Sequence, residues 1–199
     1  KIFLNVGGRP SVPAMPGLDA VPYLTNVTMM DLELVPPHLV VVGGSYVGLE
    51  FAQMFGRFGS RVTVVEMGPR VAAREDEDVS LEIQSFLRDE GIELRLHAKC
   101  ITVQKEAAGL SVGLDCEGGP PRESGTHLLL AVGRVPNTDD LGLEAAGIKT
   151  DKRGYIEGDE ALRTSNPNVW ALGDCNGKGA FTHTAYNDYE IVADNLLSN

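Results

Sequence analysis

The sequence predicts an α/β fold built around a parallel sheet, and two observations carry this prediction. An apolar run at residues 39–42 meets a glycine-rich turn and then a helical pattern, which is the order strand, turn, helix. A β-branched run of strand length follows at 61–66. Strand, helix and strand together form a βαβ unit, which requires a parallel sheet. The expected fold is therefore Rossmann-like, with three layers.

The composition excludes several classes of protein. The chain has 199 residues, of which 43% are hydrophobic and 23% charged, as in a globular protein. Its formal net charge of −11 argues against a nucleic-acid partner. The longest apolar runs are far shorter than the roughly 20 residues of a membrane-spanning helix. The three cysteines, Cys100, Cys116 and Cys175, form no C-x-x-C pair, so we expect no disulfide framework, no metal site and a cytoplasmic location.

The other elements are predicted in chain order. Residues 1–6 predict a short buried strand, and a Pro-rich surface connection follows it. The helix after the glycine turn ends at Gly59, and its apolar face includes Phe55 and Phe58. Further along the chain we expect a helix at 79–88, a strand at 92–96, a β meander at 100–103 and 110–115, a polar loop at 117–125, a buried strand at 127–132 and a last helix at 184–197.

The glycine turn is the first candidate binding element. It has the form G-x-S-x-x-G, where the dinucleotide fingerprint has G-x-G-x-x-G. The fingerprint needs a tight turn at the first glycine, close approach of the backbone to a pyrophosphate at the second, and close helix–strand packing at the third. Serine at the second position predicts a weakened but functional site, because N–H groups at the helix start still bind a diphosphate. Its residues are Gly43, Gly44, Ser45, Tyr46, Val47 and Gly48.

Glu66 is the second candidate. It ends the next predicted strand, 18 residues beyond Gly48, where an acid accepts hydrogen bonds from ribose hydroxyls. A carboxylate there repels a 2′-phosphate and favours NAD over NADP, although Arg70 and Arg74 could partly reverse this preference. A solvated strand-end glutamate is the alternative interpretation.

Two further acids are ambiguous from the residues alone. Glu50 lies two residues beyond Gly48, which suits either a nucleotide pocket or a solvated helix position. Asp174 follows a short apolar strand and a glycine, and either binds a sugar hydroxyl or belongs to an ordinary turn. The four histidines have no ligand spacing, and each is interpreted as a surface or hydrogen-bonded strand residue.

The sequence also contains a short internal repeat. An apolar strand ends in glycine and arginine both at 2–9 and at 128–134. The second copy closes the unit that begins at Gly43, so the first copy predicts a similar unit before Lys1, and the chain is interpreted as an internal piece of a longer protein. Chance similarity of two strand ends is the alternative.

Taken together, these segments resemble the FAD-dependent pyridine nucleotide-disulfide oxidoreductases, in the branch of dihydrolipoamide dehydrogenase and mercuric reductase. The resemblance covers essentially the whole chain, and the Ala-Leu-Gly-Asp sequence at 171–174 is its most specific part. It implies an NAD(P)-binding domain at 36–150 inserted into a partial FAD-binding domain, whose pieces are 1–35 and 151–199. It also implies a parent enzyme that passes a hydride from NAD(P)H to FAD and then reduces a disulfide or a related acceptor.

The resemblance assigns roles to individual residues. Glu50 and Gly133 would lie along the nicotinamide half of the nucleotide, and Gly8 belongs to the segment that crosses between the domains. Asp174 would bind the ribityl chain of FAD, and the start of the helix at Thr184 would face the flavin ring. The redox cysteine pair and the dimerisation domain of the family have no counterpart in this chain, so the homodimer implied for the parent depends on other segments.

Two other functions remain open at this point. One is a stand-alone module that binds or senses NADH without catalysis. The other is a methyltransferase, which also places an acid near a ribose, although the segment 169–174 argues against it.

Overall fold

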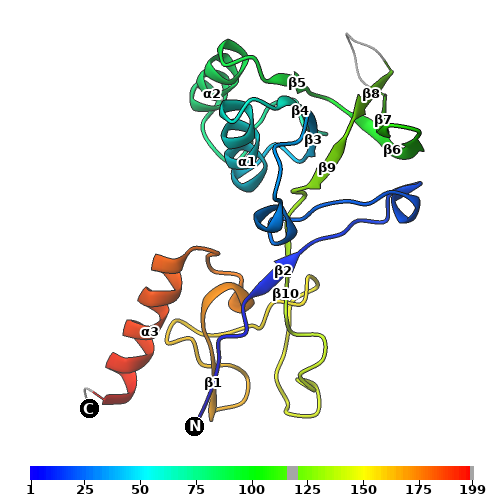
Figure 1. Ribbon diagram of the computed structural model, residues 1–199. Helices are drawn as coiled ribbons and strands as arrows, with labels where there is room; N and C mark the ends of the chain where they lie inside the picture. The colour runs from blue at the N-terminus through cyan, green and yellow to red at the C-terminus, as the bar shows by residue number, and fades with distance from the viewer. Residues whose placement is uncertain (116–120, 198–199) are drawn as a thin grey trace. The chain divides into compact units, whose positions relative to one another are not determined.

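The computed structural model describes residues 1–115 and 121–197 and divides the chain into two compact units. Unit 1 consists of Lys1–Arg9 and Arg134–Asn199, and unit 2 is Pro10–Gly133. The boundaries predicted from the sequence, after residues 35 and 150, therefore fall inside these units. Figure 1 shows the elements of each unit.

A four-stranded parallel sheet forms the centre of unit 2. Its strand order is β5-β4-β3-β9, with β3 at His38–Val42, β4 at Arg61–Val65, β5 at Glu93–Arg95 and β9 at His127–Leu130. All its pairings are parallel. Helix α1 (Tyr46–Arg57) connects β3 to β4, and α2 (Glu77–Asp89) connects β4 to β5. The predicted βαβ unit and its parallel sheet are confirmed.

Each face of this sheet is covered by a different layer. Leu39, Val41, Val62 and Val64 pack against residues of α1 and α2 on one face. Because successive strand residues point to opposite faces, their neighbours in the sequence contact the other layer. That layer is an antiparallel three-stranded sheet, β6-β7-β8, with β6 at Lys99–Glu106, β7 at Gly109–Asp115 and β8 at Arg122–Gly125. Unit 2 thus has three layers, as the Rossmann-like prediction required (Figure 1).

Several details of the sequence prediction for unit 2 were wrong. The segment Arg122–Gly125 is strand β8 rather than part of a loop, because Glu123 and Gly125 are buried against the parallel sheet. The helix α1 does end before Gly59, whose φ of +103° suits glycine, but Phe58 is 60% exposed. Cys116 and the first part of the predicted loop lie outside the described residues.

The predicted Pro-rich connection is an integral part of unit 2. Leu18 and Val21 belong to the core beneath the three-stranded sheet, and Met29 belongs to the core beneath the helices. Leu24 forms an isolated parallel bridge with Leu129 beside the parallel sheet. These buried apolar residues explain why the unit begins at Pro10 rather than near residue 36.

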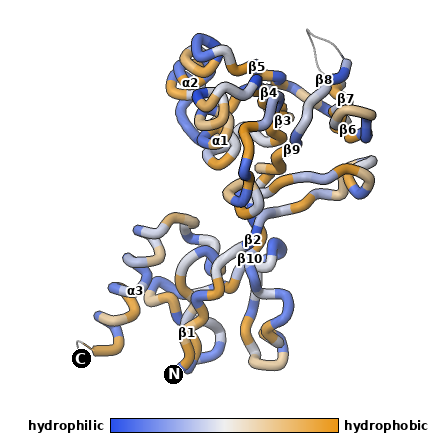
Figure 2. The backbone as a smooth tube through the Cα atoms, in the orientation of Figure 1, coloured by the Kyte–Doolittle hydropathy of each residue, from blue (hydrophilic) through white to orange (hydrophobic). Residues whose placement is uncertain are grey.

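Unit 1 is built from short strands, a short 3-10 helix and one longer helix. Strand β1 (Ile2–Leu4) pairs in parallel with β11 (Val169–Ala171), and β2 (Gly8–Pro10) pairs with β10 (Arg134–Pro136). A short 3-10 helix, η3 (Gly173–Asn176), precedes α3 (Thr182–Leu197), which begins two residues earlier than predicted. Figure 2 shows hydrophobic and hydrophilic stretches alternating along α3, and its apolar residues pack on Leu162 and Trp170. The prediction that β1 is buried was wrong, because Ile2 and Phe3 are exposed.

Candidate functional site

The glycine turn lies at the carboxyl end of β3 and at the start of α1. Gly43 has a φ of +115°, and a Cβ atom there would lie 2.3 Å from the carbonyl oxygen of Ala131. A Cβ atom on Gly48 would lie 2.0 Å from the carbonyl oxygen of Gly43. Both positions therefore lack room for a side chain, which matches the tight turn and close packing that the fingerprint needs at its first and third glycines.

Ser45 occupies the fingerprint's second position without strain. Its φ of −103° is open to any residue, and its side chain is exposed at the position before the helix. The carbonyl oxygen of Ser45 accepts the first helical hydrogen bond, from Leu49 N–H at 3.0 Å. The serine is compatible with this backbone because its side chain points away from the packed interior.

Glu66 is held against the glycine turn. Its Oε2 accepts a hydrogen bond from Gly44 N–H at 2.7 Å, and its Oε1 accepts one from Gly68 N–H at 2.7 Å. Each carboxylate oxygen retains acceptor capacity after one hydrogen bond. The two backbone donors therefore fix the direction of the carboxylate and leave it able to accept further hydroxyl donors.

The two arginines near Glu66 differ in their surroundings. Arg70 Nη1 lies 3.9 Å from Glu77 Oε2, which is a weak surface pair. Arg74 is exposed. Backbone N–H groups of Gly44 and Gly68 hold the Glu66 carboxylate at the end of β4, while Arg70 is directed to Glu77.

Tyr46 and Glu50 lie on the exposed side of α1. The Tyr46 hydroxyl donates a hydrogen bond to Glu75 Oε1 at 2.7 Å, and this bond raises the pKa of the tyrosine. Glu50 is exposed, and both residues line a groove of about 290 Å³ between α1 and α2. Val47 is half-buried in the same turn of the helix.

Gly133 lies just beyond β9, beside β3 in the sheet. It is exposed and has a φ of +124°, with nothing within 4 Å of the position a Cβ atom would take. Its carbonyl oxygen accepts a hydrogen bond from Ser11 N–H at 2.9 Å. The structure thus brings the glycine turn, Glu66 and Gly133 to the carboxyl ends of neighbouring parallel strands, where ligands of such sheets bind.

The candidate residues of unit 1 are also brought together in part. Arg134 Nη2 donates hydrogen bonds to the carbonyl oxygen of Gly8 and to Asp174 Oδ2, the latter at 3.2 Å. A hollow of about 20 Å³ lies beside Gly8, Arg134 and Asp174. Thr184 lies in the first turn of α3, where its hydroxyl donates to the carbonyl oxygen of Phe181 at 2.7 Å.

The two copies of the short internal repeat lie side by side in the structure. The segment at the end of each copy forms a strand, and these strands, β2 and β10, pair with each other. Arg9 Nη1 donates to the carbonyl oxygen of Pro136 at 3.1 Å, and Arg134 donates to the carbonyl oxygen of Gly8. Arg9 also forms a two-bond contact with Asp139, at 3.1 and 2.9 Å. Each arginine thus binds the backbone of the strand that carries the other arginine.

Sequence reasoning missed one buried acid beside Asp174. Asp188 is 7% exposed, and its Oδ2 accepts hydrogen bonds from Gly173 N–H and from Asn176 Nδ2, both at 2.8 Å. It therefore holds the Gly-Asp turn on α3. Cys175 next to this turn is fully buried, and burial raises the pKa of its thiol. No sequence signal distinguishes Asp188 from the exposed acids of the helix.

Comparison with known proteins gives this geometry a context. The family described as pyridine nucleotide-disulphide oxidoreductase matches residues 1–188. The chain belongs to this family. A mercuric reductase of Streptomyces lividans is 42% identical over 195 residues, covering 98% of this chain and 41% of the relative. The protein RclA of Escherichia coli, described as a probable pyridine nucleotide-disulfide oxidoreductase, is 38% identical over 207 residues, covering 99% of this chain and 44% of the relative.

Solved structures of the family agree with the fold. The HOCl-induced flavoprotein disulfide reductase RclA from Escherichia coli superposes with a TM-score of 0.91 at 36% identity, covering all of this chain and 45% of that one. LpdA from Mycobacterium tuberculosis superposes with a TM-score of 0.87 at 30% identity, covering 99% of this chain and 42% of that one. The chain spans less than half the length of the curated relatives it matches. None of the helices within the described residues is long and apolar enough to cross a membrane.

Proposed function

We propose that unit 2 binds NAD(H) and that the chain is part of an FAD-dependent oxidoreductase. In the parent enzyme a hydride passes from the nicotinamide to FAD, and the electrons pass on to a disulfide or a related acceptor. The parent is a homodimer in this proposal, and its dimer contacts lie in segments outside this chain. The proposal rests on the family to which the chain belongs and on the site in unit 2.

One observation carries the nucleotide assignment, namely that the Glu66 carboxylate lies 2.7 Å from the Gly44 amide of the glycine turn. The turn and the N-terminus of α1 offer N–H groups to a diphosphate. Glu66 then accepts the two ribose hydroxyls on the adenine side, since its carboxylate is already oriented by Gly44 and Gly68. A 2′-phosphate would meet this negative charge, so we infer a preference for NADH over NADPH. Glu50 and Gly133 are assigned to the nicotinamide half.

Within the described residues of unit 1, the hollow beside Asp174 is too small to enclose a flavin. This hollow of about 20 Å³ has the scale of one water molecule, and the Asp174 carboxylate beside it is engaged by Arg134. Gly8, Asp174 and Thr184 would supply only part of a flavin site. Retention of FAD therefore requires further segments of the parent, and no chemical step is assigned to unit 1.

The test is a calorimetric titration of the chain with NADH and, separately, with NADPH. We expect NADH to bind several-fold more tightly. In Glu66→Gln the ratio of the two dissociation constants should fall about tenfold, because hydrogen bonds to a charged acceptor are worth about 1.5–3 kcal/mol and the amide loses that charge. The ratio is a sound readout because both ligands meet the same folded fraction of the variant.

Glu82→Gln is the matched control, since Glu82 is an exposed acid of α2 away from the turn. It should leave both dissociation constants unchanged. Tighter binding of NADPH would show that Arg70 or Arg74 sets the preference. Absence of binding by either nucleotide, with the chain folded, would overturn the assignment of the site. Flavin absorbance in the purified parent protein separates the oxidoreductase from a stand-alone NADH-binding module.

A further inference from the structure

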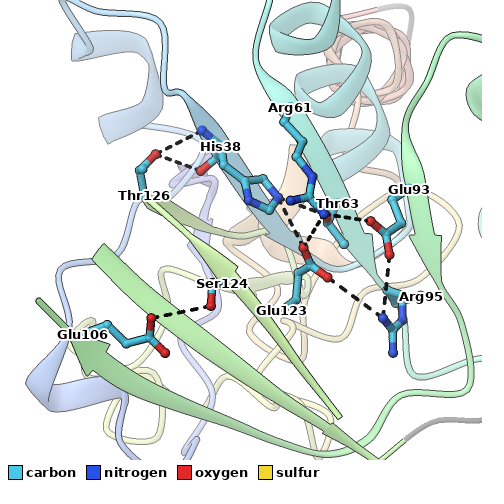
Figure 3. Close-up of polar contacts among 9 residues, drawn as sticks. All are labelled: His38, Arg61, Thr63, Glu93, Arg95, Glu106, Glu123, Ser124 and Thr126. Carbon is cyan, nitrogen blue, oxygen red and sulfur yellow. Dashed lines mark hydrogen bonds and ion pairs between the residues drawn. The ribbon is translucent and has the colours of Figure 1, made fainter. Parts of the chain in front are cut away.

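A cluster of charged side chains lies inside unit 2, away from the glycine turn (Figure 3). It occupies the face of the parallel sheet that the three-stranded sheet covers. On β3 and β4 this face is apolar towards the carboxyl ends, with Val40, Val42 and Val65 in the core. Polar side chains lie towards the amino ends of these two strands and on the edge strand β5, namely His38, Arg61, Thr63, Glu93 and Arg95.

Glu123 of β8 enters the middle of this polar region. Its side chain is 5% exposed, and Oε1 lies 2.9 Å from Arg61 Nη2. Its Oε2 lies 3.9 Å from Arg95 Nη1. The two arginines are shared with Glu93, which lies 3.2 Å from Arg61 and 3.6 Å from Arg95. A buried carboxylate of this kind is tolerated because cations and donors surround it.

His38 completes the cluster from the first position of β3. Its Nε2 lies 3.0 Å from Thr63 Oγ1 and 3.6 Å from Glu123 Oε1. Its backbone is held as well, because Thr126 N–H and Thr126 Oγ1 both donate to the His38 carbonyl oxygen at 2.9 Å. The histidine therefore contacts β8 and the link that joins β8 to β9, where the two sheets meet.

The charges around the pair come from two strands, β4 and β5. Within residues 1–115 and 121–197, the charged groups facing His38 and Glu123 are Arg61 of β4 and both Glu93 and Arg95 of β5. His127 of β9 is in register with Leu39, whose side chain packs in the opposite core, so it does not face the pair. With His38 neutral, two arginines balance two glutamates, and one more proton makes the cluster positive.

We propose that His38 and Glu123 together hold one proton and link the three-stranded sheet to the parallel sheet. The stability that this link contributes is then nearly constant across mildly acidic pH. Either residue alone would make the stability of this contact depend on pH, and the two effects have opposite signs. In the pair the two effects cancel, and this cancellation does not depend on nucleotide binding at the glycine turn.

The opposite signs follow from the environment of each group. Burial, and then Arg61, lower the pKa of His38 from its ordinary value of 6.5, so this residue weakens the folded state as pH falls below 6.5. Burial, and then Glu93, raise the pKa of Glu123 from its ordinary value of 4.5, so that residue weakens the folded state as pH rises above 4.5. Between these two values one effect grows as the other fades.

The test compares the unfolding equilibrium of the chain at several pH values between 4.5 and 6.5. Relative to the unmodified chain, Glu123→Gln should become progressively less stable as pH falls, because protonation of His38 then favours the unfolded state and no glutamate opposes it. His38→Gln should become progressively more stable over the same change. Each change is limited to tenfold in the equilibrium constant per pH unit, since one proton is linked. The double variant should regain the pH dependence of the unmodified chain.

Glu106→Gln is the control, since Glu106 is an exposed acid on the same three-stranded sheet and contacts Ser124 rather than the pair. It should not alter the pH dependence. The proposal would be overturned if the stability of both single variants, relative to the unmodified chain, changed in the same direction as pH falls. If a variant does not fold, ring NMR of the unmodified chain decides, because the pKa of His38 must lie below its ordinary value of 6.5; a pKa at or above that value would contradict the proposal.

Discussion

A side chain at Gly43 would cost stability for two reasons, namely overlap with a neighbouring backbone and strain from the positive φ. Two substitutions separate these costs. Gly43 and Gly133 have similar φ values, +115° and +124°. An alanine Cβ at Gly133 meets nothing within 4 Å, whereas one at Gly43 lies 2.3 Å from Ala131 O and 2.6 Å from Ala131 C. Gly133→Ala should therefore lose stability through backbone strain alone, whereas Gly43→Ala should lose it through backbone strain and atomic overlap.

The expected magnitudes follow from these contacts. Backbone strain of this kind costs about 1–3 kcal/mol. Overpacking adds about 1–3 kcal/mol where neighbouring atoms must move, and here the neighbour is the backbone of β9's end rather than a flexible side chain. We therefore expect Gly43→Ala to lower the free energy of unfolding of unit 2 by about 1–3 kcal/mol more than Gly133→Ala does.

Hydrogen exchange measured by mass spectrometry on peptides from β3 and β4 reads the stability of unit 2 directly, because these strands are its centre. The chain's single tryptophan lies in unit 1, so its fluorescence during denaturation serves as an internal control and should be the same in both variants. Equal losses of protection in the two variants would refute the reasoning, since the overlap at Ala131 would then cost nothing.

Three further predictions follow from single contacts. Ser45→Gly should tighten NADH binding modestly in a calorimetric titration, because it restores the fingerprint glycine; an unchanged or larger dissociation constant would contradict this. Gly56→Ala should stabilise unit 2 by about 0.5–1 kcal/mol in the exchange measurement, because the new Cβ meets side chains of Ile92 and Val62 at ordinary distances, 3.6 Å and 3.9 Å, and alanine favours helix; a loss of stability would mean that α1 cannot accept the methyl group. Asp188→Ala should destabilise unit 1 by about 1.5–3 kcal/mol, followed by tryptophan fluorescence, because Gly173 N–H and Asn176 Nδ2 lose their charged acceptor; unchanged denaturation would show that water replaces the carboxylate.

The sequence by itself determined the elements whose signals are local. The run 39–48 predicted strand, turn and helix because periodicity and glycine placement act within a few residues, and the β-branched run to Glu66 completed the unit. The nearness of Glu66 to the glycine turn followed as well, since carboxyl ends of neighbouring parallel strands meet at one sheet edge.

Only the tertiary structure decided which distant segments meet. Leu18 and Met29 assign the Pro-rich segment to unit 2 through burial, which local composition does not encode. Strand β8 was hidden in a polar stretch because Glu123 is buried by its ion partners, and polarity alone predicts exposure. The physical reason is common to both cases: burial depends on neighbours supplied from elsewhere in the chain, whereas strand, turn and helix propensities depend on the residues themselves.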